Sequence, residues 1–466
     1  MQIDLNRYNR QLEGFHKWKD AGCRGTLEYV TGMGKTFTAI QSAKHFITRE
    51  PEFRVIVGVP TDILRTDWRK NVTTHGIAQN FYVDTIHNLV KMDLDADMLI
   101  LDEIHMYVGE EAEVFPLVFE AITAEKIMGL TATLGHDGID RELVDHYCPV
   151  VDTIGLQEAL ENGWVSDYIE YNLPVELSGE DRAEYDRLDA KFRKQFKLFY
   201  NDLGVQPFDM IKKCLKIDRV TGNFIDPMAR RFANSIAHDP TRLVINATNA
   251  MRAIRERKSF LYSAPSKIHV AKQIIEMFPD KKYITFAQTT ASADAMADAV
   301  SDAKPYHSNL RTLVLHNGNP IGHKADAKGL YYIFDNARLG IAEGLYTWKQ
   351  IQDMTDRQCS RMGKETQKSY ILDLFRSNQI RGICTAMAFD QGVDEQDLEL
   401  AIILSGKAKD RQNTQRIGRV IRKKEGKRAI IVQLVLKDTQ EEKWLESRQV
   451  NTNNVKDIVS ISQIQL

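Results

Sequence analysis

Short apolar runs alternate with amphipathic, helix-forming segments over the first third of the chain. Four of these runs are each followed by turn residues and a polar loop: Thr26–Val30, Val55–Val59, Met98–Leu101 and Ile127–Leu130. Continuous apolar runs of this length indicate strands that are buried on both faces, and their alternation with helices predicts a parallel α/β sheet. We therefore expect a first α/β domain over residues 1–155.

The pattern changes in the middle of the chain and then returns. Residues 156–277 hold long polar stretches with helical periodicity and few strand candidates, which predicts a helical bridge. Strand-like runs recur at four later places: Tyr283–Ala287, Gly382–Met387, Leu400–Leu404 and Ala429–Val435. Residues 278–466 are therefore expected to form a second α/β domain. The segment 310–360 is longer than an ordinary connection and is expected to be inserted into that domain.

Composition and charge narrow the class of protein. The 466 residues are too many for one small module, and the content of 43% hydrophobic and 27% charged residues is typical of a globular fold. With 62 basic against 64 acidic residues, nothing in the net charge attracts nucleic acid or an anionic membrane. The five cysteines never form a CxxC pair, which argues against zinc and disulfides. The polar start and the lack of long apolar runs predict a cytoplasmic protein without a membrane segment.

The first apolar run leads into a glycine-rich turn before a helical segment. The turn reads TGMGKT and comprises Thr31, Gly32, Met33, Gly34, Lys35 and Thr36. Glycines allow backbone N–H groups and the helix N-terminus to face a pyrophosphate, while Lys35 would reach the β- and γ-phosphates and Thr36 would ligate Mg²⁺. The longer GxxxxGK[ST] spacing is not met, because Tyr29 stands in the place of its first glycine. The alternative is an ordinary turn with a surface lysine.

Two adjacent acids follow the run MLIL, at the carboxyl end of an expected buried strand. They are Asp102 and Glu103 of the sequence DEIH. Ligands of parallel sheets sit at this end of the strands. Asp102 can hold the Mg²⁺ that bridges the phosphates, and Glu103 can orient and deprotonate the attacking water. Taken alone, such a pair is more often a helix cap or part of a solvated loop, but the glycine-rich turn earlier in the chain reverses that preference.

Four motifs in order resemble those of superfamily 2 helicases. They are TGMGKT, DEIH, the TAT of GLTATLG, and QRIGRVIR near the end of the chain. Further stretches are similar to motif Ia (VPTDILRTDW), motif IV (YITFAQTTASADAMA) and motif V (TAMAFDQGVD), so the resemblance covers nearly the whole chain. Among these proteins the chain looks most like phage UvsW-type, RecG-like and XPB-like DNA helicases and restriction-system translocases, and less like DEAD-box RNA helicases. The resemblance implies two RecA-like, parallel-sheet P-loop domains with a helical inter-domain insertion.

The resemblance also implies roles for residues around ATP. Gln11 lies where the family has the glutamine that reads adenine, although Arg10 replaces the usual preceding aromatic residue and a plain surface role is the alternative. Gln415 would touch the γ-phosphate, and Arg416 would pair with an acid such as Asp394 near the nucleotide. Arg419 and Arg422 are one helical turn apart, so both can project from one face as arginine fingers onto the transition state. A solvated basic helix is the alternative for this stretch.

Other residues are expected to contact nucleic acid or to couple it to ATP. By resemblance, the backbone of the polymer would lie against small or hydroxylated residues: Pro60, Thr61, Thr85, Thr385 and Gly392. Coupling would run through His105, Thr131 and Thr133. Each threonine alone is more often an ordinary strand residue.

Two basic clusters and two aromatic stretches complete the candidates. The clusters are Lys407–Arg428 and the group Arg252, Arg255, Arg257 and Lys258, either of which could bind phosphates. The aromatic stretches are Phe208–Phe224 and the group Tyr331, Tyr332 and Phe334, on which bases could stack at a strand-separating wedge.

These features together predict an enzyme that hydrolyses ATP with Mg²⁺ and moves along DNA. We expect it to unwind or branch-migrate forked or junction DNA as a monomer, with 3′ to 5′ polarity by family resemblance, in phage recombination or replication. An RNA-dependent ATPase of the same fold is one alternative. A nucleotide-binding clamp or adaptor without turnover is another, although Lys35, Glu103, Arg419 and Arg422 argue against it.

Overall fold

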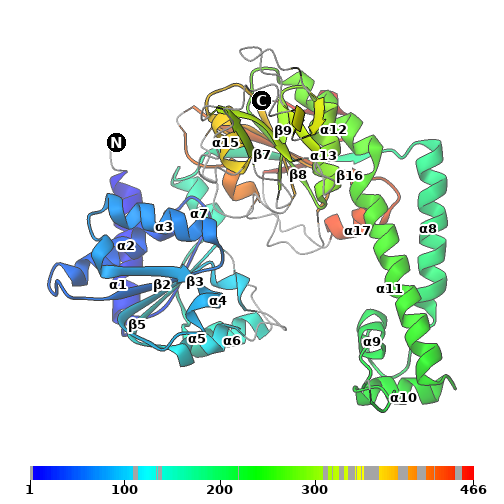
Figure 1. Ribbon diagram of the computed structural model, residues 1–466, viewed down its shortest axis with the longest axis horizontal. Coiled ribbons are helices and arrows are strands. Elements are labelled where there is room, and N and C mark those ends of the chain that lie inside the picture. Colours follow the sequence, from blue (N-terminus) through cyan, green and yellow to red (C-terminus); the bar gives the residue numbers. More distant parts are fainter. Residues whose placement is uncertain are drawn as a thin grey trace.

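The computed structural model describes most of the chain. The described residues are 4–108, 114–132, 134, 139–218, 220–307, 313–316, 319–324, 330–333, 342, 344–347, 349–350, 367–386, 397–406, 416–424, 426–446 and 454–465. They form two main α/β domains, a helical arm and a small separate sheet (Figure 1).

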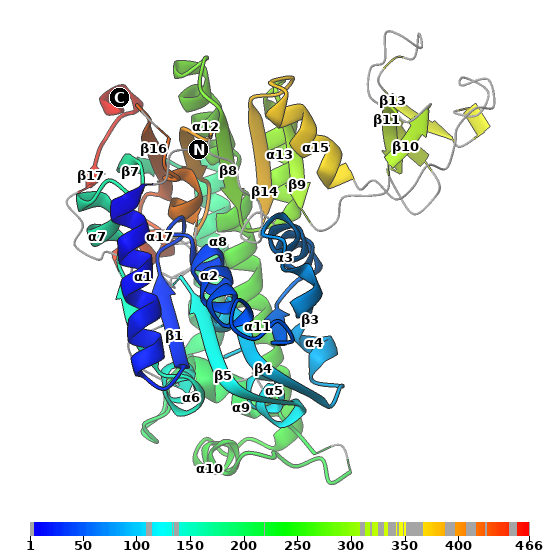
Figure 2. The same cartoon turned by 90° about the vertical axis from the view of Figure 1, so that its left-hand side faces the viewer.

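The first domain is built on a six-stranded parallel sheet with the order β3-β2-β4-β5-β1-β6. Its strands are β1 (Arg24–Tyr29), β2 (Val55–Val59), β3 (Phe81–Thr85), β4 (Leu94–Asp102), β5 (Ile122–Thr131) and β6 (Val150–Ile154). Its helices are α1 (Leu5–Asp20), α2 (Lys35–Ile47), α3 (Asp62–Thr74), α4 (Ile86–Leu89), α5 (Val114–Ala121) and α6 (Ile139–Tyr147), with short 3₁₀ turns at Ala78–Asn80 and Ile104–Met106. The four strands expected here are confirmed. Helices lie on both sides of the sheet (Figure 2).

The second main sheet has seven parallel strands in the order β17-β7-β16-β15-β8-β14-β9. They are β7 (Asp167–Val175), β8 (Tyr283–Ala287), β9 (Ala303–His307), β14 (Gly382–Ala386), β15 (Leu400–Ile403), β16 (Arg428–Leu436) and β17 (Val455–Asp457). The associated helices are α7 (Leu156–Glu161), α12 (Pro265–Met277), α13 (Thr290–Ala299), α15 (Gln367–Arg376) and α17 (Gln440–Glu446), with a 3₁₀ turn at Ile461–Gln463. The four strands expected in this half are also confirmed.

One strand of this sheet comes from the segment 156–277, which the sequence predicts to be helical. β7 pairs with β16 over nine residues, from Asp167 opposite Arg428 to Val175 opposite Leu436. Its polar residues Asp167, Glu170 and Asn172 interrupt the apolar run that marks the other strands. The helices that follow β7 are therefore inserted between two strands of the second sheet.

These inserted helices form an arm that projects from the second domain (Figure 1). They are α8 (Gly179–Lys197), α9 (Pro207–Cys214), α10 (Pro227–Ser235) and α11 (Pro240–Ser263), three of which begin with a proline at the favoured first position. The arm has its own apolar core, which includes Phe199, Met210, Phe224, Phe232 and Leu243. Phe224 is fully buried in this core, so it is not available as the wedge aromatic that the sequence suggests.

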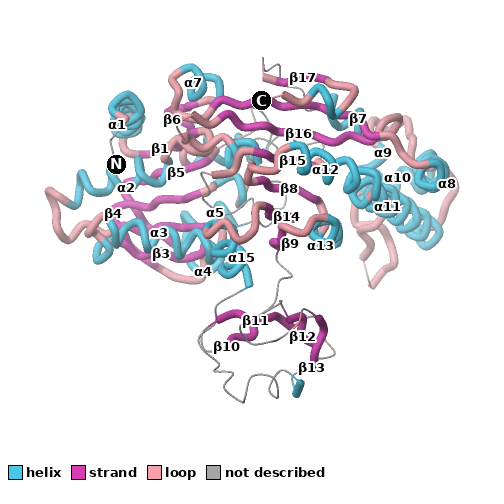
Figure 3. Tube along the Cα trace, turned by 90° about the horizontal axis from the view of Figure 1, so that it is seen from above, coloured by secondary structure: helices cyan, strands magenta, loops and turns pink. Residues whose placement is uncertain are grey.

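The expected insertion at 310–360 contains a four-stranded antiparallel sheet. Its strands are β10 (Leu313–His316), β11 (Asn319–Lys324), β12 (Leu330–Ile333) and β13 (Gly344–Thr347). This sheet stands apart from the two main domains (Figures 2 and 3). Tyr331 and Tyr332 lie on β12, whereas Phe334 lies outside the described residues.

Within the part of the chain that the structure describes, no helix is both long and apolar enough to span a membrane.

A buried ion pair joins two helices of the second domain. The Nζ of Lys267 on α12 lies 2.6 Å from Oε1 of Glu441 on α17, and both side chains are almost fully buried. The other carboxylate oxygen of Glu441 accepts from the backbone N–H of Leu436 at 3.0 Å. The pair therefore links both helices to the end of β16.

Replacing Lys267 with methionine should lower the free energy of unfolding of the second domain by about 3 to 5 kcal/mol, because Glu441 is left as an uncompensated buried charge. The measurement is the urea transition followed by circular dichroism. Adding Glu441→Gln to Lys267→Met should recover most of the loss. Lys437→Met is the matched control, since its pair with Glu176 is exposed and should contribute less than about 1 kcal/mol. A single Lys267 variant as stable as the parent would contradict the prediction.

Candidate functional site

The glycine-rich turn joins the end of β1 to the start of α2. Gly32 and Gly34 have φ angles of 95° and 80°, in the left-handed region that favours glycine. A side chain at position 34 would place its Cβ 2.7 Å from Nε2 of Gln11. The positive φ angles therefore favour glycine at both positions of the turn, and position 34 also lies close to the Gln11 side chain of α1. Arg7 of α1 also donates a hydrogen bond to the carbonyl of Gly32.

Lys35 is the first residue of α2 and its side chain is buried. Its Nζ donates to the carbonyl of Tyr29 at 3.2 Å and lies 3.9 Å from Oε1 of Glu103. The ammonium group is thus held between the turn and the acidic pair. Phosphate oxygens bound at the turn could replace the carbonyl as its partner without moving the helix.

Asp102 and Glu103 stand at the carboxyl end of β4, as expected. Oδ2 of Asp102 accepts from the indole Nε1 of Trp68 at 2.7 Å, and Oδ1 accepts from the backbone N–H of Glu103 at 2.9 Å. Glu103 has a φ of 49°, which is strained for a residue with a side chain. The strained backbone turns Glu103 out of the strand, beside Lys35.

The two acids have opposite pKa shifts. Burial, reinforced by the charge of Glu103, raises the pKa of Asp102 to about 6. Burial also acts to raise the pKa of Glu103, but the charges of Lys35, His105 and Arg419 outweigh it and hold that pKa below its usual value. Glu103 is therefore kept as a carboxylate, the form that can accept a proton from water.

His105 connects the acidic motif to β5. Its Nδ1 is hydrogen-bonded to Oγ1 of Thr131 at 3.0 Å and lies 3.3 Å from Oε2 of Glu103. Two residues of the expected coupling group, His105 and Thr131, are thus in contact. Thr133, the third residue of that expected group, lies outside the described residues.

The late basic motif of the second domain reaches the glycine-rich turn of the first. A Cβ added to Gly418 would lie 2.5 Å from the Cβ of Thr31, so the backbone of the helical residues 416–420 packs directly on the turn. Arg419 and Arg422 then enter the same cavity as Lys35. Burial, followed by repulsion from Arg7, lowers the pKa of Arg422 to about 10, while Asp67 acts in the opposite direction.

This inter-domain cavity has a volume of about 760 Å³ and brings together nine of the expected site residues. They are Thr31, Gly32, Gly34, Lys35, Thr36, Asp102, Glu103, Arg419 and Arg422. Met33 is buried beneath the turn, and its carbonyl accepts from Gln11. Three further expected residues, Gly392, Asp394 and Gln415, lie outside the described part of the chain.

The cavity wall also contains residues that are absent from the sequence-based set, among them Arg7, Asp67, Trp68 and Arg376. Trp68 ends the stretch VPTDILRTDW. Its position could have been noticed, because an indole carries one N–H donor on an apolar ring and this one lies two helical turns after the end of a strand. No sequence pattern distinguishes Arg7 or Arg376 from the other arginines.

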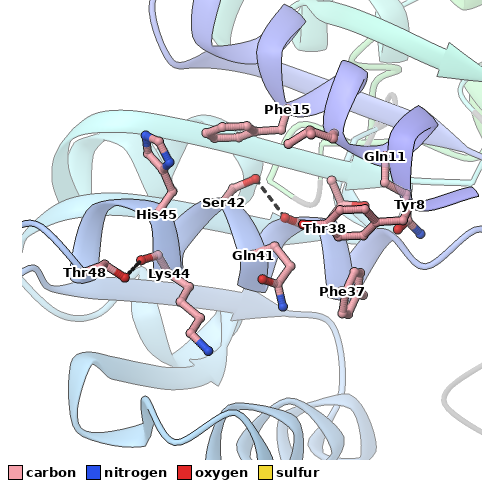
Figure 4. Close-up of a pocket in the computed structure, with 11 residues that line it drawn as sticks. Tyr8, Gln11, Phe15, Phe37, Thr38, Gln41, Ser42, Lys44, His45 and Thr48 are labelled. Carbon is pink, nitrogen blue, oxygen red and sulfur yellow. Dashed lines mark hydrogen bonds between the residues drawn. The ribbon is translucent and has the colours of Figure 1, made fainter. Parts of the chain in front are cut away.

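A second cavity, of about 320 Å³, lies between α1 and α2 beside the turn (Figure 4). Gln11 is buried in its wall and donates from Nε2 to the carbonyl of Met33 at 2.6 Å. Tyr8 and Phe37 also line this cavity, with their rings 6.4 Å apart in an edge contact. Tyr8 lies one helical turn before Gln11 and therefore places an aromatic ring on the same face of α1. Arg10 points elsewhere, to Asp152 and Glu158.

Some of the residues expected to contact nucleic acid are partly exposed in the structure, whereas another is buried. Pro60 and Thr61 follow β2, Thr85 ends β3 beside them in the sheet, and the hydroxyl of Thr61 caps α3 by accepting from Leu64 N–H at 3.4 Å. Thr385, by contrast, is buried inside β14, so its hydroxyl cannot contact a polymer in this conformation.

The basic group on the bridge likewise contains both buried and exposed residues. Arg257 is buried, forms an ion pair with Asp189 at 2.5 Å and stacks on Phe192, so it has a structural role rather than a phosphate-binding one. Arg416 is likewise buried, donating to the carbonyls of Ser405 and Ala287. Arg252 and Arg255 are exposed.

Magnesium with a nucleotide fits this arrangement. The described residues hold no group of three or more His, Cys, Asp or Glu side chains placed to bind a metal. Mg²⁺ in such sites takes one or two protein oxygens and completes its shell with phosphate oxygens and water. Thr36 and Asp102 line one cavity and supply that number, and the raised pKa of Asp102 is the mark of a buried carboxylate without a full countercharge.

Comparison with known proteins gives three similarities. Residues 4–91 match the family model described as type III restriction enzyme, res subunit. The chain is 24% identical to the DNA 3′-5′ translocase XPB2 of Sulfurisphaera tokodaii over 457 residues. This match covers 94% of this chain and 83% of that protein. The crystal structure of the Pyrococcus furiosus Hef helicase domain is similar with a TM-score of 0.45 and 13% identity, over 95% of this chain and 99% of that one.

Gly418→Ala should disfavour the closed arrangement of the two domains, because the new methyl group overlaps Thr31. Overpacking of this kind costs about 1 to 3 kcal/mol, which corresponds to a population shift of roughly 5- to 150-fold. The measurement is the distance between fluorescent labels on the two domains. Gly155→Ala is the control, since nothing lies within 4 Å of its added Cβ. Unchanged label distances in Gly418→Ala would show that the contact does not hold the domains together.

Proposed function

We propose that this chain, which belongs to the superfamily 2 helicases and is XPB-like, translocates along DNA and uses that movement to unwind or branch-migrate forked or branched substrates. It is an ATP-dependent helicase enzyme. The observation that carries the proposal is the shared cavity. Arginines of the second domain line the same space as the lysine and acids of the first.

The residues divide the work of hydrolysis between the domains. ATP, when bound with Mg²⁺, supplies the phosphoanhydride bond that water cleaves. The backbone of the glycine-rich turn and Lys35 would hold its phosphates, and Thr36 and Asp102 would hold the metal. Glu103 would orient the attacking water and accept its proton. Arg419 and Arg422 would place positive charge where the transition state is negative.

Closure of the domains connects this chemistry to movement. The arginines reach the phosphate turn only while Gly418 rests against Thr31. Trp68 provides a second connection, because it lies on α3, whose first turn is capped by Thr61, and it donates to Asp102. A shift of α3 caused by a polymer at Thr61 would therefore be transmitted to the metal-binding carboxylate.

DNA is the proposed polymer, with movement from 3′ to 5′. The motif pattern and the similarity to a protein named as a DNA 3′-5′ translocase support this choice. We place the protein in DNA recombination or replication, within a phage-infected cell, on the basis of the motif resemblance. A monomer suffices for the proposed activity, because one chain contributes both sides of the cavity.

Lys35→Ala and Arg422→Ala should each abolish ATP hydrolysis for different reasons. Loss of Lys35 removes a phosphate ligand and should weaken nucleotide binding. Loss of Arg422 should lower the rate by about 10³ to 10⁵ with a smaller effect on affinity. Steady-state hydrolysis and equilibrium binding of a fluorescent ATP analogue separate the two. Lys424→Ala is the control, because Lys424 is partly exposed and pairs with Asp397 outside the cavity. Normal turnover in Arg422→Ala would remove the second domain from the chemistry.

The same assay identifies the polymer. Single-stranded DNA, RNA, a fork and a four-way junction are compared as activators of hydrolysis in the parent protein. DNA should stimulate hydrolysis and forks should be unwound. Stimulation by RNA alone would contradict the proposal in favour of an RNA-dependent enzyme, and binding without hydrolysis would favour a nucleotide-dependent clamp.

Gln11 and Tyr8 should determine the choice of nucleotide base. If the base lies against Tyr8 and Gln11 in the smaller cavity, Gln11→Ala should reduce the preference for ATP over GTP by roughly tenfold, since a lost polar contact of this kind is worth about 1 to 2 kcal/mol. The measurement is kcat/KM for each nucleotide. Gln41→Ala is the matched control, because Gln41 lines the same cavity further along α2. Equal preference in the parent and Gln11→Ala proteins would exclude this role.

A further inference from the structure

The chain passes from the first sheet to the second through α7 and a short buried connection. The connection comprises residues 162–166 and turns at Gly163, whose φ is 64°. Trp164, Val165 and Ser166 are each at most 5% exposed. Trp164 and Val165 belong to the apolar cluster that joins the two sheets. The connection is therefore packed inside the protein, and both domains contribute to its surroundings.

Val165 places this connection beside the glycine-rich turn. A Cβ added to Gly32 would lie 3.6 Å from Cγ1 of Val165, at ordinary van der Waals distance. The backbone N–H of Trp164 donates to the carbonyl of Ala159 at 2.8 Å, which holds the connection to α7. The next residue, Ser166, is consequently held at a set position relative to the turn.

Ser166 makes three hydrogen bonds with the late basic motif and the residues that follow it. Its N–H donates to the carbonyl of Ile421 at 2.7 Å, and its hydroxyl donates to the carbonyl of Arg422 at 3.0 Å. The same hydroxyl accepts from the backbone N–H of Lys424 at 3.1 Å. One buried side chain thereby uses its donor and its acceptor on the segment 421–424.

These bonds lie where the helix that carries the arginines ends. The helical residues are 416–420, so Arg422 lies beyond the last residue of the helix. The final carbonyls of a helix have no partner within it and need one from outside. The carbonyl of Arg422 accepts from the hydroxyl of Ser166 at 3.0 Å and from Nζ of Lys427 at 3.2 Å. The backbone of Arg422 is therefore positioned by residues outside the helix.

Arg419 is held in a different way. It lies within the helical residues and directly follows Gly418, whose backbone packs on Thr31. The two arginines of the inter-domain cavity thus have separate supports, which are close packing for Arg419 and hydrogen bonds from Ser166 for Arg422. A change at position 166 should consequently affect Arg422 and leave Arg419 in place.

We infer that Ser166 is a positioning residue for Arg422. Arg422 lines the inter-domain cavity, and the direction in which its side chain leaves the backbone depends on the carbonyl that Ser166 holds. A misplacement of about 1 Å in a group that acts on the transition state can lower a rate by roughly a hundredfold. The inference rests on the proposed function for the role of Arg422, and it deepens that function by assigning the residue that sets this arginine.

The test compares Ser166→Ala with Thr439→Val in the full-length protein. Each substitution removes one buried hydroxyl that is both donor and acceptor to the backbone. Thr439 is the matched control, because its hydroxyl donates to the carbonyl of Leu436 at 2.7 Å and accepts from the N–H of Glu441 at 3.2 Å, beyond the other end of β16. Thermal unfolding checks that both variants fold. Steady-state ATP hydrolysis with single-stranded DNA gives kcat and KM.

Ser166→Ala should lower kcat roughly tenfold, which corresponds to about 1.4 kcal/mol and is the size of effect expected when one or two hydrogen bonds are lost. KM for ATP, and the affinity for an analogue that is not hydrolysed, should stay within about twofold, because residues of the first domain would hold the phosphates and the base. Thr439→Val should keep kcat and KM within about twofold of the parent.

A second pair of variants tests whether the effect passes through Arg422. The low residual rate of Arg422→Ala is followed in single-turnover experiments, with and without Ser166→Ala. Adding Ser166→Ala should change this rate by less than about twofold, since a residue that acts only through Arg422 has no effect once Arg422 is absent. A general defect in folding or closure would lower the residual rate as much as it lowers the rate of the parent.

Three results would overturn the inference. They are an unchanged kcat in Ser166→Ala, an equal loss in Thr439→Val, and a loss from Ser166→Ala that persists in full in Arg422→Ala. Failure of the proposed function has a different signature, because the parent would show no hydrolysis stimulated by DNA or Arg422→Ala would turn over normally. Either of these results also removes the inference, whereas a normal Ser166→Ala beside an impaired Arg422→Ala overturns the inference alone.

Discussion

The contact between Gly418 and Thr31 is the constraint on which the inter-domain cavity depends. Buried apolar residues of the two sheets form one continuous cluster, and where the sheets meet only a residue without a side chain allows the backbone to approach the glycine-rich turn. Arg419 and Arg422 follow at once in the sequence, so this approach sets where their guanidinium groups can reach. The site is therefore a property of the closed pair of domains, and neither domain contains it alone.

Within the first domain, the cavity depends in a similar way on Asp102. Its two oxygens accept from Trp68 and from the backbone of Glu103, and the carboxylate remains buried with a raised pKa. Such a group is costly without a cation, because burial penalises the charged form. The strained backbone of Glu103 and the indole of Trp68 together hold this carboxylate in place, as the proposed binding of Mg²⁺ with a nucleotide would require.

The parts of this structure that could be predicted from the sequence are those recognisable from the local spacing of residues. The glycine-rich turn, the acids after β4 and the arginines one turn apart each follow from spacing, and all of them line one cavity. β7 was not predicted because Asp167, Glu170 and Asn172 break its apolar run and its place is set by pairing with β16. Arg257 and Arg252 look alike in sequence, and only packing against Phe192 and Asp189 distinguishes the buried one. Trp68 contacts Asp102 across 34 positions of the chain, which no local pattern records.

Both ends of the helical arm are rooted in one sheet, since the chain leaves for the arm from β7 and returns through α12 to β8. The arm must therefore move together with the second domain. α11 has 24 residues and extends about 36 Å, so each degree of rotation at its base displaces its far end by roughly 0.6 Å. Any rotation of the second domain would therefore displace the far end of the arm further than its base, in proportion to the length of α11.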